Sequence, residues 1–333
     1  MRIGLIGAGA IARRHLQTLA GCDVEVTAVC DPDPGRAAEA AAGPGAVQYS
    51  GWEQMLEVEP LDAVLICTPP MAHAEPFLAA LARGLAVYVE KPFARTLPDG
   101  LAMVEAWQSG ACVCAVGYQW RSLSLLDTIR QALGDTPPGL LVSRSYGPTE
   151  AGRGDLGGAG SWFSDPARSG GILFELGSHD IDLQLAIAGP AVAVQGMSSS
   201  GRLALAGAPA ADLDDAVAVV LQFAAGGLGA IHVAWNPAQD PPVYTLDVQA
   251  PEAALSLVLD PELRLTGRAR GKTVEATAAA DPRRSSLERF LAAARAGDRE
   301  MVHCTPADAL GTLRVALACE AAVASGARVP VTT

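Results

Sequence analysis

The segment Glu90-Lys91-Pro92 carries the first group of side chains that could do chemistry. It follows the apolar run 86–89, which has the composition of a short buried strand. In an open sheet of parallel strands, ligands bind at the carboxyl ends of the strands. A lysine amine at such an edge could donate hydrogen bonds to a substrate oxygen and stabilise a developing alkoxide. The structural alternative is a lysine whose stem lies along the surface with its charge in water.

A carboxylate and an imidazole form the second group. Glu175 and His179 stand four residues apart in the stretch 173–187, whose spacing predicts a helix. Both then lie on one helix face, and Asp182 joins them at the seventh position after Glu175. A carboxylate beside an imidazole orients the ring and raises its pKa, which suits a general base. An ordinary pair on a helix surface would give the same pattern.

A glycine-rich turn near the start of the chain predicts a dinucleotide site. Residues 7–12, Gly-Ala-Gly-Ala-Ile-Ala, follow the apolar run 2–6 and precede a stretch with helical spacing. Gly7 permits a tight turn, Gly9 lets the backbone approach a pyrophosphate, and Ala12 lets the helix pack closely on the sheet. We expect the cofactor to contact Gly7, Gly9, Ala10 and Ile11.

An acidic residue about 20 positions after the glycines indicates which cofactor binds. Asp31 follows the second predicted strand, residues 24–30, and could accept hydrogen bonds from the ribose diol of NAD. The same carboxylate would repel the 2′-phosphate of NADP. The sequence therefore favours NAD(H). NADP(H) stays the alternative, because Arg13 and Arg36 could neutralise that phosphate.

The elements that would position these groups alternate between strand and helix in the first third of the chain. Strand and helix patterns follow each other at 2–6, 10–20, 24–30, 36–42, 63–67, 73–83, 86–89, 98–108 and 111–117. This alternation predicts a doubly wound parallel sheet. We therefore expect an α/β protein in which residues 1–119 form a dinucleotide-binding Rossmann domain.

From residue 120 onward the alternation stops, and residues 120–333 predict an α+β domain for substrate binding and oligomerisation. Strand patterns occur at 140–146, 192–198, 216–223, 228–235, 244–250 and 254–259, and helix patterns at 123–133, 173–187, 285–296 and 306–325. Gly226-Gly227 reads as a hairpin turn. Helices on one face of an open, largely antiparallel sheet leave the other face for a partner, so we expect a homodimer or homotetramer.

Composition narrows the functional class. With 333 residues the chain exceeds the usual size of one core, and its net charge of -12 argues against a nucleic-acid partner. It contains no run of eighteen apolar residues, so no membrane span is expected. The first residues already form a strand pattern, which leaves no room for a signal peptide and favours the cytoplasm. The seven cysteines include no C-x-x-C pair and predict buried thiols rather than a metal site.

The combination of these motifs resembles the Gfo/Idh/MocA family, which includes glucose–fructose oxidoreductase and inositol dehydrogenase. The resemblance covers essentially the whole chain and rests on residues 7–12, 67–74 (Cys-Thr-Pro-Pro-Met-Ala-His-Ala), 90–92 and 169–179. It implies a Rossmann domain, an open mixed-sheet domain, and NAD(P)-linked oxidation or reduction at a carbon of a sugar, cyclitol or related polyol. It also makes Lys91–Pro92 a candidate for a cis peptide bond.

Matching motifs assign roles to individual residues. Lys91 takes the place of the family's catalytic lysine, and His179 that of its general acid/base. Glu175 falls where many members carry aspartate, and Ser169 where many carry a third glycine. The resemblance implies a nicotinamide near Thr68, Pro69, His73 and Glu90, with substrate between it and the helix of Glu175 and His179. Side chains that could recognise the substrate are Tyr118, Arg121, Arg153, Trp162 and Asp180.

Two alternatives stay open. One is a non-catalytic dinucleotide sensor or regulator on the same fold, although Lys91 and His179 are both present. The other is a reductase of a nucleotide-linked keto-sugar, which the sequence does not separate from an enzyme acting on a free sugar or cyclitol.

Overall fold

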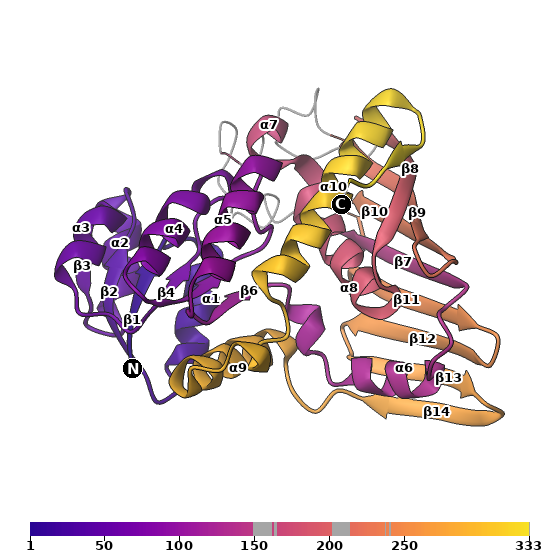
Figure 1. Ribbon diagram of the computed structural model, residues 1–333, viewed down its shortest axis with the longest axis horizontal. Helices are drawn as coiled ribbons and strands as arrows, with labels where there is room; N and C mark the ends of the chain where they lie inside the picture. Colours follow the sequence, from indigo (N-terminus) through magenta and orange to yellow (C-terminus); the bar gives the residue numbers. More distant parts are fainter. Residues whose placement is uncertain (149–161, 163–164, 202–213, 237, 240, 333) are drawn as a thin grey trace. The chain divides into compact units, whose positions relative to one another are not determined.

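The chain divides into two compact units, shown in Figure 1 as a computed structural model. The first comprises residues 1–119 and 283–310, and the second residues 120–282 and 311–333. The structure describes residues 1–148, 162, 165–201, 214–236, 238–239 and 241–332. Arg153, one of the predicted recognition residues, therefore falls outside the described residues.

The first unit is built on a six-stranded sheet in the order β3-β2-β1-β4-β5-β6, with every pair parallel. Its strands are β1 Arg2–Ile6, β2 Glu25–Cys30, β3 Val47–Tyr49, β4 Ala63–Ile66, β5 Ala86–Val89 and β6 Cys114–Val116. Its helices are α1 Ala10–Leu19, α2 Pro34–Ala42, α3 Trp52–Val58, α4 Ala74–Ala82, α5 Leu97–Ser109 and α9 Pro282–Ala296. This confirms the predicted doubly wound sheet. The strand order reverses between β1 and β4, where such folds bind dinucleotides.

Helix α9 differs from the expected domain assignment, which placed residues 283–310 in the second domain. Leu287 and Phe290 are fully buried in the core cluster that also contains Leu5 of β1. The rings of Tyr88 and Phe290 meet edge to face with centroids 5.6 Å apart. Apolar burial thus draws this distant segment onto the first sheet.

The second unit contains a nine-stranded sheet in the order β14-β13-β12-β11-β7-β10-β9-β8-β15. Only the β7–β10 pair is parallel, which confirms the predicted open, largely antiparallel sheet. Its strands are β7 Leu140–Gly147, β8 Ala191–Ser200, β9 Asp214–Phe223, β10 Leu228–Trp235, β11 Val243–Ala250, β12 Ala253–Asp260, β13 Arg264–Ala269, β14 Lys272–Thr277 and β15 Val329–Pro330. Gly226 and Gly227, with φ of 90° and 80°, form the predicted turn between β9 and β10.

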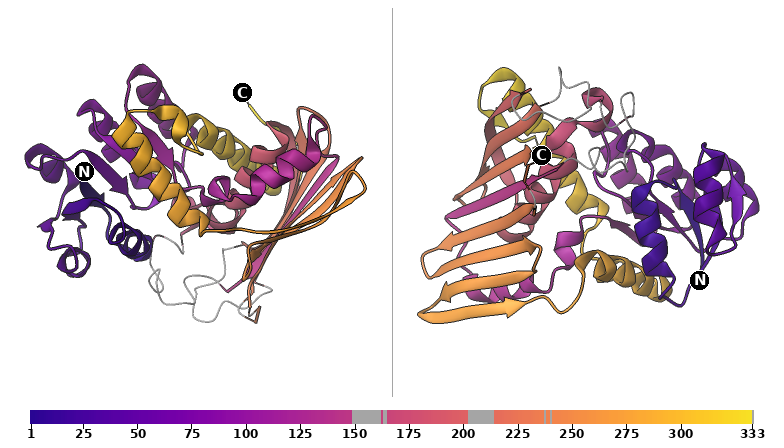
Figure 2. Two further views of the ribbon diagram at one scale, coloured as in Figure 1. Left: turned by 90° about the horizontal axis from the view of Figure 1, so that it is seen from below. Right: turned by 180° about the vertical axis from the view of Figure 1, so that it is seen from behind.

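Helices cover one face of this sheet and leave the other open (Figure 2). The helices of this unit are α6 Leu125–Leu133, α7 Pro166–Ser169, α8 Ser178–Ala188 and α10 Pro306–Ser325, of which α6 and α8 pack on the sheet. Helix α8 contacts β7 and β10, whereas α6 contacts β12 and β13. Strand β9 shows the two faces in its alternation: Val217, Val219 and Leu221 are buried, and the residues between them are exposed.

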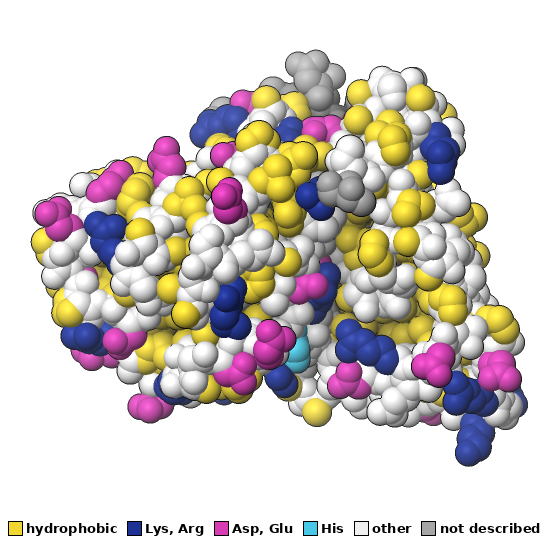
Figure 3. Space-filling model, viewed as in Figure 1, with side chains coloured by type: hydrophobic (Ala, Val, Ile, Leu, Met, Phe, Trp, Pro, Cys, Tyr) yellow, Lys and Arg dark blue, Asp and Glu magenta, His cyan; other side chains and the backbone are white. Residues whose placement is uncertain are grey.

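On the face drawn in Figure 3, Lys and Arg side chains lie scattered among acidic and apolar ones. Within the described part of the chain, no helix is long and apolar enough to cross a membrane. Nor do three or more His, Cys, Asp or Glu side chains gather there as metal ligands would.

Candidate active site

Gly7 forms the tight turn at the carboxyl end of β1. Its φ is +91°, a backbone conformation that L side chains rarely adopt. A Cβ at this position would lie 2.8 Å from the carbonyl carbon and oxygen of Cys67, just after β4. The turn after β1 and the end of β4 therefore approach each other too closely for any side chain at position 7.

Gly9 has a different reason to be glycine. It caps the start of α1 with φ of -73°, which any residue can adopt, and a Cβ there would meet no atom within 4 Å. The space above it is open, and the first-turn amides of a helix have no acceptor within the helix. The half-buried residues Ala10 and Ile11 begin that turn. This arrangement fits the pyrophosphate of a dinucleotide.

Asp31 lies directly after β2 and ties the glycine turn to that strand. Its carboxylate accepts hydrogen bonds from the backbone N–H of Ala8 at 2.8 Å and of Asp33 at 2.9 Å. The half-exposed guanidinium of Arg36 lies 3.6 Å from it. The carboxylate is thus fixed at the sheet edge where the sequence predicts the adenosine ribose.

Substituting Asp31 should change the cofactor preference. We expect NADH to bind more tightly than NADPH, because the Asp31 carboxylate accepts from the ribose diol and repels a 2′-phosphate. Asp31→Ala should reduce the difference between the affinities for NADH and NADPH, which fluorescence titration with both cofactors measures. Asp31→Asn is the matched control for the loop, since its amide oxygen can still accept from Ala8 or Asp33. Equal or tighter NADPH binding by the wild type would contradict this assignment.

The buried side chain of His73 contacts the turn that follows β4. Thr68 and Pro69 are half-buried, whereas His73 is fully buried. The Nε2 atom of His73 lies 2.8 Å from the Thr68 carbonyl oxygen, and its Nδ1 lies 3.2 Å from that of Phe93. Burial lowers the pKa of His73. A neutral ring carries one N–H, so it donates to one of these two carbonyl oxygens. His73 therefore lies between the turns after β4 and β5, inside the unit.

Lys91 stands at the carboxyl end of β5, as predicted. The Lys91–Pro92 peptide bond is cis, and the Lys91 side chain is half-buried. Its backbone N–H donates to Glu90 Oε2 at 3.1 Å. Glu90 itself is 6% exposed, and its Oε1 lies 2.6 Å from Nε2 of His15. The first unit thus gathers all the predicted cofactor residues along one sheet edge, with His73 and Glu90 largely below its surface.

In the second unit, the segment Ser169-Gly170-Gly171 shapes the start of the predicted catalytic helix. Gly170 has φ of +78°, and a Cβ there would lie 2.3 Å from the ring of Phe174. The Ser169 hydroxyl accepts a hydrogen bond from Gly171 N–H at 3.0 Å. A π-helix, Leu173–Gly177, follows and runs directly into α8. Such turns occur frequently at functional sites.

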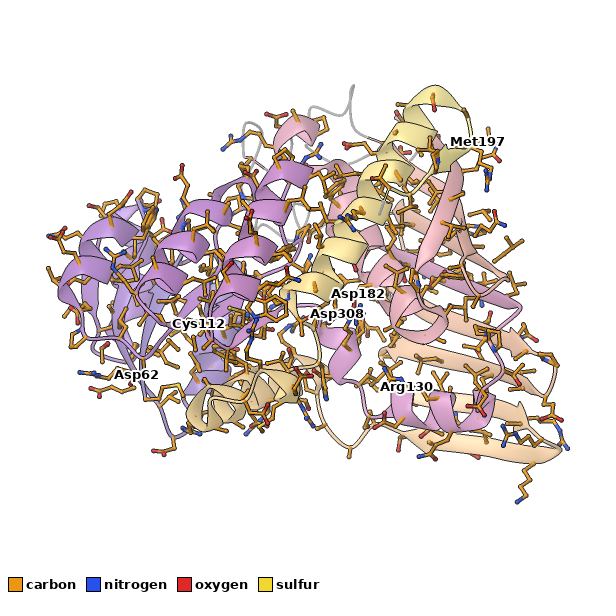
Figure 4. All side chains as sticks on the ribbon, in the orientation of Figure 1. Asp62, Cys112, Arg130, Asp182, Met197 and Asp308 are labelled. Carbon is orange, nitrogen blue, oxygen red and sulfur yellow. The ribbon has the colours of Figure 1, made fainter. Side chains whose placement is uncertain are left out.

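Glu175 lies on this π-helix, and His179 lies in the first turn of α8; both are half-buried. Asp182 differs from the expectation that it joins them. It is 1% exposed and accepts from Nε of Arg121 at 2.9 and 3.0 Å and from the Thr312 hydroxyl at 2.9 Å (Figure 4). Its carboxylate therefore anchors α8 to the turn 119–122 and to α10.

The predicted recognition residues have different surroundings. Arg121 directs its Nε at Asp182, and its side chain is 12% exposed. Tyr118 is 2% exposed, whereas Trp162 is half-buried. Trp120, which was not among the predicted residues, meets the ring of His179 edge to face with centroids 6.4 Å apart. Its position directly before Arg121 was the available signal.

Asp180, also expected to recognise substrate, is instead part of a buried network. It is 3% exposed and accepts hydrogen bonds from Ser143 and Ser145 of β7. Gln184 donates to the Ser143 hydroxyl at 2.9 Å and to the Ala230 carbonyl at 3.0 Å. Burial raises the pKa of Asp180 to about 7. This network fastens α8 to the sheet.

The raised pKa of Asp180 predicts a pH-dependent stability. The folded protein holds a proton here that the unfolded chain releases, so this contribution is complete below the ordinary carboxyl pKa. It is lost as the pH rises through about 7. Asp180→Asn keeps a neutral side chain at every pH. Between pH 5 and pH 8, the free energy of unfolding of Asp180→Asn should rise by about 2–3 kcal/mol relative to that of the wild type, as measured by denaturant unfolding. A constant difference would contradict the raised pKa.

Both halves of the chain match one protein family. Residues 1–118 match the family described as "Oxidoreductase family, NAD-binding Rossmann fold", and residues 142–252 match the GFO/IDH/MocA C-terminal domain. The chain belongs to the Gfo/Idh/MocA oxidoreductase family. Its first unit is therefore an NAD-binding Rossmann domain, and the resemblance seen in the motifs is confirmed.

Individual relatives match more narrowly. The chain is 39% identical over 124 residues to 4-carboxy-2-hydroxymuconate-6-semialdehyde dehydrogenase of Sphingobium sp. and 36% identical over 111 residues to inositol 2-dehydrogenase of Leifsonia xyli. These stretches cover 36% and 33% of the chain, and 39% and 33% of the relatives. A levoglucosan dehydrogenase structure, in complex with NADH and levoglucosan, shares the fold. Its TM-score is 0.86 at 21% identity, covering 100% of this chain and 99% of that one.

Proposed function

We propose that this member of the Gfo/Idh/MocA family is an NAD(H)-dependent oxidoreductase acting on a carbon-bound hydroxyl or carbonyl of a sugar, cyclitol or related polyol. The observation that carries the proposal is the position of Lys91 at the carboxyl end of β5. It lies on the same sheet edge as Gly7, Gly9 and Asp31, which fit a dinucleotide. The inositol 2-dehydrogenase relative supports the substrate class.

The proposed chemistry gives each side chain one role. In the oxidative direction His179 accepts the hydroxyl proton, and Lys91 donates a hydrogen bond to the oxygen as negative charge develops on it. Bound NAD supplies the acceptor for the hydride that leaves the carbon. Glu175 orients the imidazole. The proposed cofactor contacts are Gly7, Gly9, Ala10, Ile11, Asp31, Thr68, Pro69, Glu90 and Lys91, and the proposed substrate contacts are Lys91, Tyr118, Arg121, Trp162, Glu175 and His179. His73, which the sequence also placed at the cofactor, is fully buried and supports the turn after β4 instead.

A substrate panel tests this proposal. Purified protein is mixed with NAD or NADH and with free sugars, cyclitols and nucleotide-linked keto-sugars, and NADH absorbance is followed. Turnover of a free sugar or cyclitol supports the leading proposal, and turnover of nucleotide-linked substrates alone supports the keto-sugar reductase. Tight NADH binding without turnover of any substrate would favour a non-catalytic sensor.

We also propose that the open sheet face of the second unit binds a second copy of the chain. Leu140 and Leu228 are paired in register on β7 and β10, and are 38% and 47% exposed. On the same face, Val220 of β9 is 44% exposed, and Met197 of β8, labelled in Figure 4, is 77% exposed. Exposed apolar side chains at this density are typical of interaction surfaces.

A charge placed on this face should break the assembly. We expect sedimentation to show a dimer or tetramer for the wild type and a smaller species for Val220→Arg, because a buried arginine without a partner is costly. Val58→Arg on α3, at a position 58% exposed in the first unit, is the matched control and should leave the assembly intact. A monomeric wild type at working concentration would overturn the proposal.

The cysteines support a reducing compartment. All seven are free thiols, five of them buried and two half-buried. Proteins of oxidising compartments use cysteines mainly in disulfides. We propose the cytoplasm as the location of the protein.

A further inference from the structure

A buried pair of ionisable side chains lies beneath the turn that carries Lys91. His15 of α1 is fully buried, and Glu90 is 6% exposed. Nε2 of His15 lies 2.6 Å from Oε1 of Glu90, and the backbone N–H of Lys91 donates to Oε2 of the same carboxylate at 3.1 Å. The mechanism proposed above uses neither His15 nor the charge of Glu90.

The hydrogen bonds favour an ionised Glu90. Each carboxylate oxygen faces a donor, so a proton on either oxygen would oppose Nε2–H of His15 or N–H of Lys91. Nδ1 of His15 makes no hydrogen bond within the described part of the chain. Nε2 is therefore the ring nitrogen of His15 whose proton has an acceptor, and that acceptor is the Glu90 carboxylate.

The surroundings make His15 important for that charge. Burial raises the pKa of Glu90, but the hydrogen bond and charge of His15, followed by the charge and N–H of Lys91, bring that pKa below its ordinary value. The other titratable groups near Glu90 are neutral at working pH. Burial raises the pKa of Cys67 and Tyr88, and it lowers the pKa of His73.

Packing fixes the position of the pair. A Cβ at Gly117 would lie 3.0 Å from both Glu90 oxygens, so the carboxylate fills the space beside that backbone. The ring of Tyr88 meets that of His15 edge to face, with centroids 5.4 Å apart. Neither Glu90 nor His15 can therefore shift readily to a new partner.

We infer that His15 is a positioning residue: it keeps Glu90 ionised, and the carboxylate in turn holds the turn and the charge of Lys91 for the reaction. The inference rests on the proposed function of Lys91. It gives α1 a second role besides its amino end at the dinucleotide, because one turn further along it supplies the donor to Glu90.

The test follows pH dependence rather than activity at one pH. His15→Leu removes the donor, so burial should raise the pKa of Glu90. The ratio of kcat between His15→Leu and the wild type should then fall about tenfold for each pH unit below that raised pKa. Taking the ratio cancels any pH dependence that both proteins share. His15→Gln, whose amide can donate from a similar place, should restore the wild-type profile.

Two further variants separate this effect from simple damage to the core. Tyr88→Phe removes the hydroxyl that lies 3.3 Å from Ser286 but leaves the pair intact, so its ratio to the wild type should not depend on pH. Glu90→Gln should lower kcat by the same factor at every pH. Adding His15→Leu to it should cause no further loss, because both changes act through one charge.

A measurement without turnover keeps the two proposals distinguishable. In protein labelled with 13C-glutamate, infrared spectra at mildly acid pH should show one protonated carboxyl band in His15→Leu in addition to those of the other glutamates. This extra band should be missing from the wild type and from the double variant. A pH-independent ratio without that band, in an enzyme that still needs Lys91, would overturn this inference and leave the proposed function standing. The band without turnover of any substrate would overturn the role of Lys91 but not the effect of His15 on Glu90.

Discussion

Replacing Lys91 by methionine or His179 by alanine should lower kcat by about a hundredfold or more, since acid–base and oxyanion terms are typically of that size. NADH affinity should change little, because the glycine turn and Asp31 hold the dinucleotide through other contacts. Steady-state kinetics on a substrate found in the panel, with fluorescence titration of NADH, measures both quantities.

The chain offers matched controls for these variants. Lys272 on the exposed edge strand β14 is the only other lysine, so Lys272→Met tests the loss of a lysine elsewhere. His303 is exposed, and His303→Ala serves the same purpose for histidine. Both should keep wild-type kcat. Near-normal turnover in Lys91→Met and His179→Ala would make the catalytic assignment wrong.

The pH–rate profile gives a second view of His179. In the oxidative direction the profile should have an ascending limb, because only the neutral imidazole accepts the proton. The limb should be absent in His179→Ala. Glu175→Gln should move it to lower pH, since a neutral amide stabilises the imidazolium less than a carboxylate does. An unchanged limb in Glu175→Gln would show that Glu175 does not act on the ring.

Local patterns made the first unit predictable. Strands β4 and β5 are continuous apolar runs, and β1 is buried beyond its exposed Arg2. The turns that follow these strands carry the predicted residues. Strand β3 was not predicted, because three residues with Val47 52% exposed carry no strand pattern. Helix α9 was assigned to the second unit, since the burial of Phe290 depends on a partner about 200 residues away in the sequence.

The candidate site was predictable in its residue types but not in its supporting contacts. Lys91 and His179 were found from motifs with known spacing. The bond between His15 and Glu90 joins residues 75 positions apart, and no local spacing reports it. Asp182 was taken as a site group from its helical spacing, and Asp180 from its position beside His179. Instead, Asp180 accepts from buried serine hydroxyls and Asp182 from Arg121, and such partners appear only once the sheet and helices are assembled.

Substitutions at the two glycines of the dinucleotide turn should change different quantities: NADH affinity at Gly9 and the free energy of unfolding at Gly7. Gly9→Val should weaken NADH binding by about tenfold to a hundredfold, because its side chain would occupy the space where a pyrophosphate meets the amino end of α1. Stability should be unchanged, since φ of -73° suits valine and the Cβ meets no protein atom within 4 Å. Fluorescence titration and denaturant unfolding measure the two effects.

Gly7→Ala should instead lower the free energy of unfolding by on the order of 3 kcal/mol, because φ of +91° and backbone atoms of Cys67 at 2.8 Å leave no room for a methyl group. Each variant is the other's control. If the two glycines serve only the fold of the turn, Gly9→Val should bind NADH with the affinity of the wild type. That result would show that the dinucleotide does not approach α1. Weaker NADH binding by Gly9→Val at unchanged stability would place the dinucleotide at the amino end of α1.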